Sequence, residues 1–366
     1  MKKKTIFFGS VLVLGLTVAW WSRGGAEPVF KKSYPVQVTS EHYEGTVVWP
    51  KTNNQQQQAG EASGVAVGPN GDIYYLHRAN GTYGSKAVIK EATIVVLDGE
   101  TRTVKRTIGQ NLFQSPHGLE VDDANNIWVT DISLNQVFKL NPEGDVQAVY
   151  GQAYPFGTEA GLRIRNKLPN FPVRLNAYLF ARPTDVTVLP DGSFAVADGY
   201  RNHRIAKFDR TGKFEWEVNQ LGSADGQLNL PHGISSDDAS NLYVADRNNA
   251  RIQVFDRFGR HQQTWDQPEL GRPYGVEVGP DGKVYVADGG DYLNGRTTDA
   301  RSQVLVLNQQ GTILERFGSF GTEPGQLRIA HDLAVADDGT IFVAELMNKR
   351  LQQFTPSSSS EISQSN

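Results

Sequence analysis

Three of the seven histidines follow a proline or an alanine in closely similar stretches of sequence. They are His117 in "SPHGLEV", His232 in "LPHGISS" and His331 in "IAHDLAV". Three neutral imidazoles with one open coordination position can hold a catalytic zinc ion, because the open position accepts water or substrate. The function of the chain therefore depends on whether folding brings these three residues together.

The three stretches belong to a unit that occurs six times. Each unit has a strand, a tight turn rich in Gly, Asp and Asn, a second strand that usually ends in an acid, a loop and further strand sequence. The units begin near Ser63, Pro116, Pro183, Pro231, Pro273 and Ala330. Four-stranded units of this length are typical of propeller blades, because one small sheet cannot bury both faces alone. We predict an all-β fold, a six-bladed β-propeller with a metal site in its central channel.

Equivalent positions in a propeller lie on a circle around the channel. His117, His232 and His331 come from the second, fourth and sixth units, so we expect them to converge with near-threefold symmetry. The other three units have no histidine at this position, where they carry Gly64, Thr184 and Tyr274. A single histidine after proline is more often a turn residue, but three at one repeat position favour a metal. Zinc fits these ligands, and other divalent metals also bind three imidazoles.

The second strands end in acids, and the residues that follow should lie at one mouth of the channel. We expect these acids to accept backbone N–H groups rather than do chemistry: Asp131, Asp198, Asp246, Asp288 and Glu345. Directly after the strand ends come Arg78, Tyr200 and Arg247. An arginine pairs with a carboxylate through two parallel hydrogen bonds, and nearby cations favour the phenolate of a tyrosine. The set predicts a site for a small anionic substrate with a removable proton.

The remaining segments set the expected boundaries. We predict the propeller over residues 45–355 and a disordered Ser-rich tail over 356–366. The last unit has only three strands, and "YEGTVVW" near residue 45 is expected to supply the fourth. This pairing would close the ring and cover two open sheet edges. The stretch "NNQQQQ" at 53–58 is expected to be loop or disordered.

The N-terminus resembles an export signal, with three lysines, an apolar run over 6–21 and small residues at 24–26. We expect residues 1–26 to be a signal peptide or membrane anchor, followed by a linker over 27–44. The protein would then be exported to the cell envelope, anchored by residues 6–21 or secreted after cleavage, with no other membrane attachment. The net charge of −4 argues against a nucleic-acid partner. With no cysteine, any metal ligands must be histidines and oxygen donors.

Several motifs of the sequence resemble those of a known family. "NLFQSPHGL", "PTDVTVLPDGSFAVADGYRNHRI", "VADRNNARIQVF" and "AHDLAVADDGTIFVAE" are similar to peptidyl-α-hydroxyglycine α-amidating lyase, a six-bladed propeller of NHL-type repeats. The resemblance runs from about Val65 to Phe354. It implies that His117, His232 and His331 bind zinc, that Arg78 and Arg247 are functional arginines and that Tyr200 is the catalytic base. It also implies a structural calcium ion held by Asp332 and by the backbone carbonyls of Val65 and Leu119, ligands that suit calcium.

The reaction implied by the resemblance is cleavage of the C–N bond of a peptidyl- or acyl-α-hydroxyglycine, which gives an amide and glyoxylate. The expected partner is thus a small-molecule or peptide substrate with a terminal carboxylate. Two alternatives stay open: an exported propeller that binds protein or glycan, and a related metal-dependent hydrolase or lyase for another small acid. The chain departs from animal members in lacking a disulfide near Ala181 and Arg201. It also has an insertion over 151–180, expected to be an ordered surface loop or a basic lid.

Overall fold

The protein is described by a computed structural model that covers residues 43–154, 156–168, 173, 175–295 and 300–356. The predicted leader over 1–26, most of the linker over 27–44 and the tail after residue 356 lie outside the described residues. Within the described residues, no helix is both long and apolar enough to cross a membrane.

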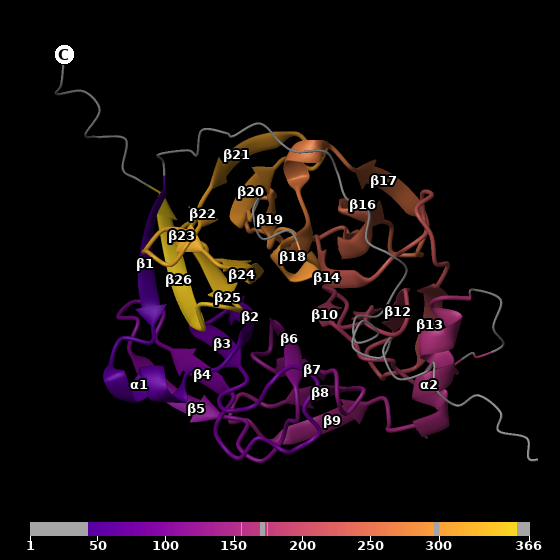
Figure 1. Cartoon of the computed structure of the whole chain (residues 1–366), viewed down its shortest axis with the longest axis horizontal. Coiled ribbons are helices and arrows are strands. Elements are labelled where there is room, and N and C mark those ends of the chain that lie inside the picture. The colour runs from indigo at the N-terminus through magenta and orange to yellow at the C-terminus, as the bar shows by residue number, and fades with distance from the viewer. Residues whose placement is uncertain (1–42, 155, 169–172, 174, 296–299, 357–366) are drawn as a thin grey trace, which may run out of the picture.

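Six four-stranded antiparallel sheets are arranged around a central axis, as Figure 1 shows. Blades one to five are β2–β5 (Ala62–Val67, Ile73–His77, Ile94–Leu97, Val104–Ile108), β6–β9 (Pro116–Val121, Ile127–Asp131, Gln136–Leu140, Val146–Tyr150), β10–β13 (Asp185–Val188, Phe194–Asp198, Arg204–Phe208, Phe214–Val218), β14–β17 (Pro231–Ser236, Leu242–Asp246, Arg251–Phe255, His261–Trp265) and β18–β21 (Pro273–Val278, Val284–Asp288, Gln303–Leu307, Ile313–Phe317). Blade six contains β24 (Ala330–Val335), β25 (Ile341–Glu345) and β26 (Arg350–Pro356). The predicted six-bladed propeller is confirmed.

The ring is closed by a strand from the opposite end of the chain. Strand β1 (Tyr43–Trp49) pairs antiparallel with β26, with Thr46 opposite Gln353, and completes blade six in the order β1-β26-β25-β24. In Figure 1 the indigo strand β1 lies beside the yellow β26. This confirms the predicted fourth strand. The closure covers the outer edge of β26, which would otherwise be free to pair with another chain.

The second strand of a blade is buried on both faces, whereas the outermost strand is half exposed. In blade three, all five residues of β11 are buried, while β13 alternates between partly buried and exposed residues. Aromatic rings fill the space between blades two and three: Trp128 and Phe194 have ring centroids 4.9 Å apart, and Phe194 stacks on Phe208 at 5.1 Å. Packing between blades therefore holds the innermost strands in place around the channel.

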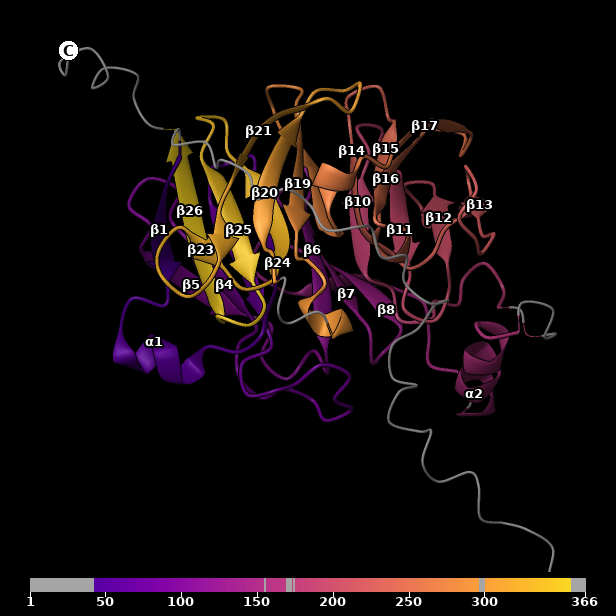
Figure 2. The ribbon, with the colours of Figure 1, turned by 45° about the horizontal axis from the view of Figure 1, so that its top comes forward.

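Short elements lie outside the blades. Residues 53–58 form helix α1 (Asn53–Gln58), so the expectation of a loop or disorder there is wrong. A capping box explains the helix, because Thr52 accepts the Gln55 N–H while the Gln55 side chain accepts the Thr52 N–H. The insertion over 151–180 contains helix α2 (Phe156–Arg165), which Figure 2 shows beside blade three. Strands β22 (Ser319–Phe320) and β23 (Gln326–Leu327) form a small parallel pair.

Candidate metal centre and active site

Each of the three histidines lies on the innermost strand of its blade, at a β-bulge. Pairing of β6 with β7 shifts between Pro116 and Leu119, so that His117 and the following glycine face one partner residue. The same shift occurs in β14 around His232 and in β24 around His331. A bulge bends the strand and turns a side chain away from the regular alternation. In β6 the freed Gly118 N–H donates to Thr130 Oγ1 at 2.8 Å, which satisfies the group that left the ladder.

The glycine after His117 allows neighbouring innermost strands to approach closely. A Cβ atom on Gly118 would lie 2.7 Å from both Asp185 Cα and Thr184 O, which are backbone atoms of blade three. Those backbone atoms cannot move without shifting the next blade. The contact therefore sets the distance between blades two and three beside the His117 imidazole.

We expect Gly118→Ala to lower the free energy of unfolding by about 1–3 kcal/mol, the usual cost of overpacking a dense interior. Urea unfolding of the purified variant measures this change. Gly157→Ala in α2 is the matched control, because a Cβ there meets no atom within 4 Å. Equal stability of the two variants would show that the blades can separate without cost.

The three imidazoles meet in the channel. The candidate ligand atoms of His117, His232 and His331 all lie within 4.8 Å of one another. Each Nδ1 lies against a backbone carbonyl: Thr184 O at 2.7 Å, Tyr274 O at 2.8 Å and Ser63 O at 2.9 Å, respectively. A carbonyl oxygen only accepts hydrogen bonds, so each Nδ1 carries the proton and each Nε2 presents a lone pair. This is the orientation of histidines that bind a metal through Nε2.

The surroundings keep the imidazoles neutral. Burial, with the nearby charges of Arg78 and Arg247, lowers the pKa of His117 well below the ordinary value, and burial with the charge of Arg247 does the same for His232. The same causes lower the pKa of His331 to about 3. Neutral imidazoles at physiological pH are available as ligands without first losing a proton.

Tyr200 lies between two of the histidines. Its hydroxyl is 2.9 Å from His117 Nε2 and 3.1 Å from His232 Nε2. Burial raises the pKa of the Tyr200 phenol above its ordinary value, and the charges of Arg247 and Arg78 only partly oppose this. The arginine charges alone therefore do not lower the pKa of this phenol. A phenol in contact with two lone pairs donates its proton to one of them.

Two buried arginines face the same mouth of the channel. Arg78 follows β3 and pairs with Glu61 at 3.0 Å, but its Nε and Nη2 have no hydrogen-bond partner among the described residues. Arg247 opens the short 3₁₀ turn Arg247–Asn249 after β15, and its Nε likewise lacks a partner in the described part of the chain. Its guanidinium lies over the ring of Tyr274 at 4.7 Å and that of Tyr200 at 5.7 Å. Buried donors without partners are costly, and these N–H groups are suited to donate to an anion.

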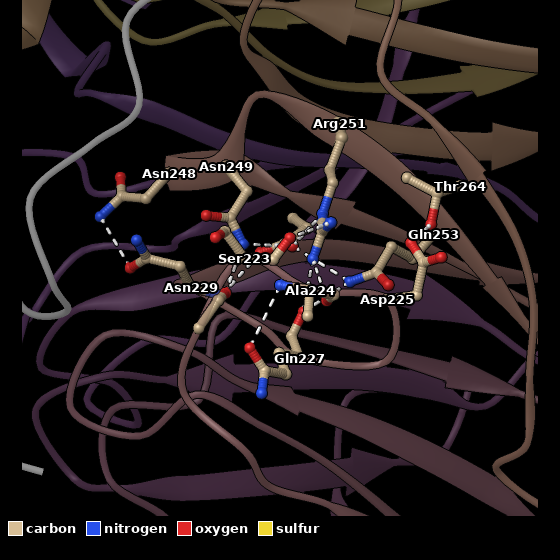
Figure 3. A network of polar contacts seen from close by, with 12 residues as sticks. Ser223, Ala224, Asp225, Gln227, Asn229, Asn248, Asn249, Arg251, Gln253 and Thr264 are labelled. Atoms are coloured by element: carbon tan, nitrogen blue, oxygen red, sulfur yellow. Dashed lines mark hydrogen bonds and ion pairs between the residues drawn. The ribbon is translucent and has the colours of Figure 1, made fainter.

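The acids at the strand ends hold the segments that lead into the innermost strands. Asp131 accepts the Gln114 and Ser115 N–H groups at 2.7 and 2.8 Å, just before β6. Asp246 accepts the Asn229 N–H at 2.7 Å before β14 and also pairs with Arg251 at 2.8 Å. Figure 3 shows the surrounding network, in which Arg251 donates to the carbonyls of Ser223, Ala224 and Gln227. The structural role expected for these acids is confirmed.

The backbone before two of the histidines adopts a rare conformation. Leu230 and Ile329, two residues before His232 and His331, have φ angles of 64° and 61°. Non-glycine residues, and β-branched ones above all, seldom adopt this left-handed region. Hydrogen bonds stabilise this conformation: the Asn229 N–H donates to Asp246, and the Arg328 N–H donates to Glu345.

A separate group of acids lines the channel farther along the innermost strands. Four carboxylates border one cavity together with the Val65 and Leu119 backbone; they are Glu120, Asp185, Glu277 and Asp332. Asp332 Oδ2 accepts the Val65 N–H at 3.0 Å. Burial raises the pKa of Asp332 to about 7 and that of Glu277 to about 8. Carboxylates held this close favour either protonation or a cation.

Sequence reasoning identified the residues around the histidines and missed several others. Glu120, Asp185 and Glu277 were not assigned, although each follows the histidine position of its unit by one or three residues. Tyr274 was noted at that position without a role, and its buried hydroxyl has no hydrogen-bond partner within the residues that the structure describes. No repeat signal points to Glu61, the partner of Arg78, because it precedes the first unit.

Comparison with known proteins agrees with this architecture. The NHL repeat model matches residues 180–208 and 228–255. Peptidyl-glycine alpha-amidating monooxygenase B of Xenopus laevis is 33% identical over 86% of the chain, which covers 36% of that protein. Peptidyl-alpha-hydroxyglycine alpha-amidating lyase 2 of Drosophila melanogaster is 30% identical over 81% of the chain and 71% of that protein. The chain thus spans about a third of the monooxygenase and most of the lyase.

Solved structures share the fold at low sequence identity. A streptogramin B lyase has a TM-score of 0.56 and 15% identity, over 87% of this chain and 100% of that one. A gluconolactonase from Xanthomonas campestris has a TM-score of 0.57 and 14% identity, over 91% of this chain and 98% of that one. The fold and the histidine cluster define a class: six-bladed NHL-type propellers with a candidate metal centre in the channel. The chain belongs to the peptidyl-α-hydroxyglycine α-amidating lyase family.

Proposed function

We propose that the protein is a zinc-dependent lyase that cleaves the C–N bond of peptidyl- or acyl-α-hydroxyglycine to give an amide and glyoxylate. The observation that carries the proposal is the contact of the Tyr200 hydroxyl with Nε2 of His117 and His232 beside two buried arginines. A binding module needs no such convergence of imidazole, phenol and guanidinium groups. The names of the relatives support this reaction over another chemistry on the same fold.

The three histidines fit a zinc ion. Each has a backbone acceptor at Nδ1 and an unprotonated Nε2, which in His117 and His232 is in contact with the Tyr200 hydroxyl. His117, His232 and His331 would hold the ion and leave a coordination position open. When bound, zinc acts as a Lewis acid that polarises a substrate oxygen.

The arginines account for recognition of the carboxylate. Arg247 and Arg78 are buried and carry donors that no described residue accepts. A substrate carboxylate would accept these N–H groups and bring the neighbouring hydroxyl towards Tyr200. Because the guanidinium charges stay fixed at any working pH, this interaction needs no proton transfer.

Tyr200 is proposed as the group that moves the proton. As phenolate it takes the proton of the substrate hydroxyl, and the electron pair of that O–H bond forms the carbonyl of glyoxylate. The C–N bond breaks, and the amide nitrogen takes a proton from the phenol that has just formed. Burial favours the protonated phenol, and the charges of Arg78 and Arg247 oppose this and favour the phenolate.

A calcium ion is proposed at the acid-lined cavity. Asp332 and the Val65 and Leu119 carbonyls would bind it as the family resemblance implies, and Glu120, Asp185 and Glu277 add negative charge around it. Hard oxygen donors favour calcium over softer metals.

This site predicts a pH dependence of stability for calcium-free protein. The pKa of Glu277 is raised by burial to about 8, so the folded state holds a proton that the unfolded state releases. With respect to this group, stability should therefore be highest at low pH, fall as pH rises from about 4.5 to about 8, and level off above that. Above pH 7 the channel histidines are neutral in the folded state and mostly neutral in the unfolded state, so a fall between pH 7 and 9 reports mainly on the acids.

The measurement is the unfolding temperature of protein stripped of metals with EDTA, taken at pH 7 and at pH 9. The same two temperatures are then measured after calcium is added in excess over the EDTA. We expect a fall of several degrees without calcium, and little change with calcium, because the cation favours the charged carboxylates. Glu277→Gln should reduce the fall. A pH-independent unfolding temperature in EDTA would contradict the acid-cluster account.

The proposed reaction is tested by product analysis. The protein is incubated with zinc and N-benzoyl-α-hydroxyglycine, and the products are identified by NMR. Benzamide and glyoxylate in equal amounts would support the proposal. Opening of a lactone substrate with no release of glyoxylate would instead assign the site to a different reaction.

The lysines and apolar run at the N-terminus support a further proposal, that the enzyme acts outside the cytoplasm.

A further inference from the structure

Helix α2, in the insertion between blades two and three, contacts the loop that carries Tyr200. Arg165 Nη2 donates to the Arg201 carbonyl at 3.0 Å and to Asn202 Oδ1 at 2.5 Å. Asn166, directly after the helix, donates to the same Arg201 carbonyl at 3.1 Å. The insertion therefore binds the two residues that follow Tyr200 and is more than a surface loop.

A second contact passes through Glu159 near the start of α2. Its carboxylate accepts Arg201 Nε at 2.9 Å and lies 3.7 Å from Arg182 Nε. Tyr154 donates its hydroxyl to Glu159 at 3.0 Å. Although burial opposes it, the charges of Arg201 and Arg182 lower the pKa of Glu159, which keeps it ionised. Arg201 is only 1% exposed, so loss of the carboxylate would remove a charged hydrogen-bond partner from a buried guanidinium.

The backbone of the Tyr200 loop is held from its other side by the segment before β10. Arg201 N–H donates to Ala181 O at 3.0 Å, and Tyr200 N–H donates to Arg182 O at 3.4 Å. Residues 200–202 therefore lie between residues 181–182 and α2. The Arg201 guanidinium also donates to the Tyr200 carbonyl at 3.2 Å, so the ion pair with Glu159 acts directly on the tyrosine backbone.

We propose that Glu159 is a positioning residue, which works through Arg201 to hold the Tyr200 hydroxyl between the two histidines. We name Glu159, Arg165, Asn166 and Arg201 the α2 clamp. The inference rests on the proposed lyase function, in which Tyr200 moves a proton. A proton-transfer group must lie within hydrogen-bonding distance of its target, and displacement of about 1 Å can cost up to 10²-fold in rate.

The test compares three variants of the full chain loaded with zinc. Glu159→Gln removes the charge and should lower kcat about tenfold with KM changed less than twofold. Glu159→Asp keeps the charge and should recover most of kcat. Arg163→Gln is the matched control, because Arg163 pairs with the same carboxylate at 3.2 Å, is one-third exposed and contacts no residue of the Tyr200 loop in the described contacts.

Hydrogen–deuterium exchange supplies a readout that needs no substrate. In Glu159→Gln, amides of residues 199–203 should exchange about tenfold faster, while those of β24 around His331 stay unchanged. Unchanged exchange and kcat in Glu159→Gln would overturn the proposal, as would equal loss in Arg163→Gln. The exchange measurement tests the α2 clamp even if the wild-type protein releases no glyoxylate. A lack of glyoxylate release would overturn only the proposed lyase function.

Discussion

Replacing Tyr200 by phenylalanine is expected to lower kcat by about 10²- to 10⁴-fold, the usual contribution of a positioned acid–base group. The change removes one oxygen atom, which contacts His117 Nε2 and His232 Nε2, and leaves the ring packed against Tyr83 at 5.3 Å between centroids. KM should change little, because the proposed carboxylate contacts belong to the arginines. Steady-state glyoxylate release measures both constants.

Zinc content must be measured on the same samples, because Tyr200 touches two of the candidate ligands. We expect one zinc ion per chain in both wild type and Tyr200→Phe. Tyr285→Phe is the matched control and should leave kcat unchanged, since the Tyr285 hydroxyl bonds Asp281 in the turn between β18 and β19. A Tyr200→Phe protein with full zinc and wild-type kcat would exclude the phenol as the proton-transfer group.

Replacing His117 by alanine is expected to abolish both zinc binding and glyoxylate release. The variant loses one of three ligands and also the neighbour of Tyr200, so activity should fall by more than about 10³-fold. His261→Ala is the control, because His261 lies on the outermost strand β17 and bonds Thr264 rather than the channel.

Metal content is measured after equilibration with one equivalent of zinc, and folding is checked by circular dichroism. We expect both variants to stay folded, because the substitutions leave the hydrophobic clusters between the blades intact. If the His117→Ala protein keeps both zinc and turnover, the catalytic zinc ion is not bound by the three channel histidines.

Repetition made most of the fold and the centre of the site predictable from sequence. Six equivalent strand openings required six blades, and a shared register placed His117, His232 and His331 on one circle. The same logic predicted that the N-terminal strand completes blade six, because a three-stranded last blade leaves an open edge.

Features set by tertiary contacts were not predictable in this way. The pKa of Tyr200 depends on how deeply the ring is buried, and burial outweighs the nearby arginines. Helix α2 lies in an insertion with no counterpart in the other blades, so no repeat predicts its contacts with Arg201. The short helix α1 was missed because its glutamine run was interpreted as low-complexity sequence, and the capping box formed by Thr52 and Gln55 was not considered.

Titration of zinc into the metal-free protein tests the central claim most directly, with glyoxylate release from N-benzoyl-α-hydroxyglycine as the readout. The account predicts no release without metal, a linear rise up to one zinc ion per chain and a plateau beyond it. Full activity in the metal-free protein, or no glyoxylate from folded protein with zinc bound, would contradict a lyase built on the three channel histidines.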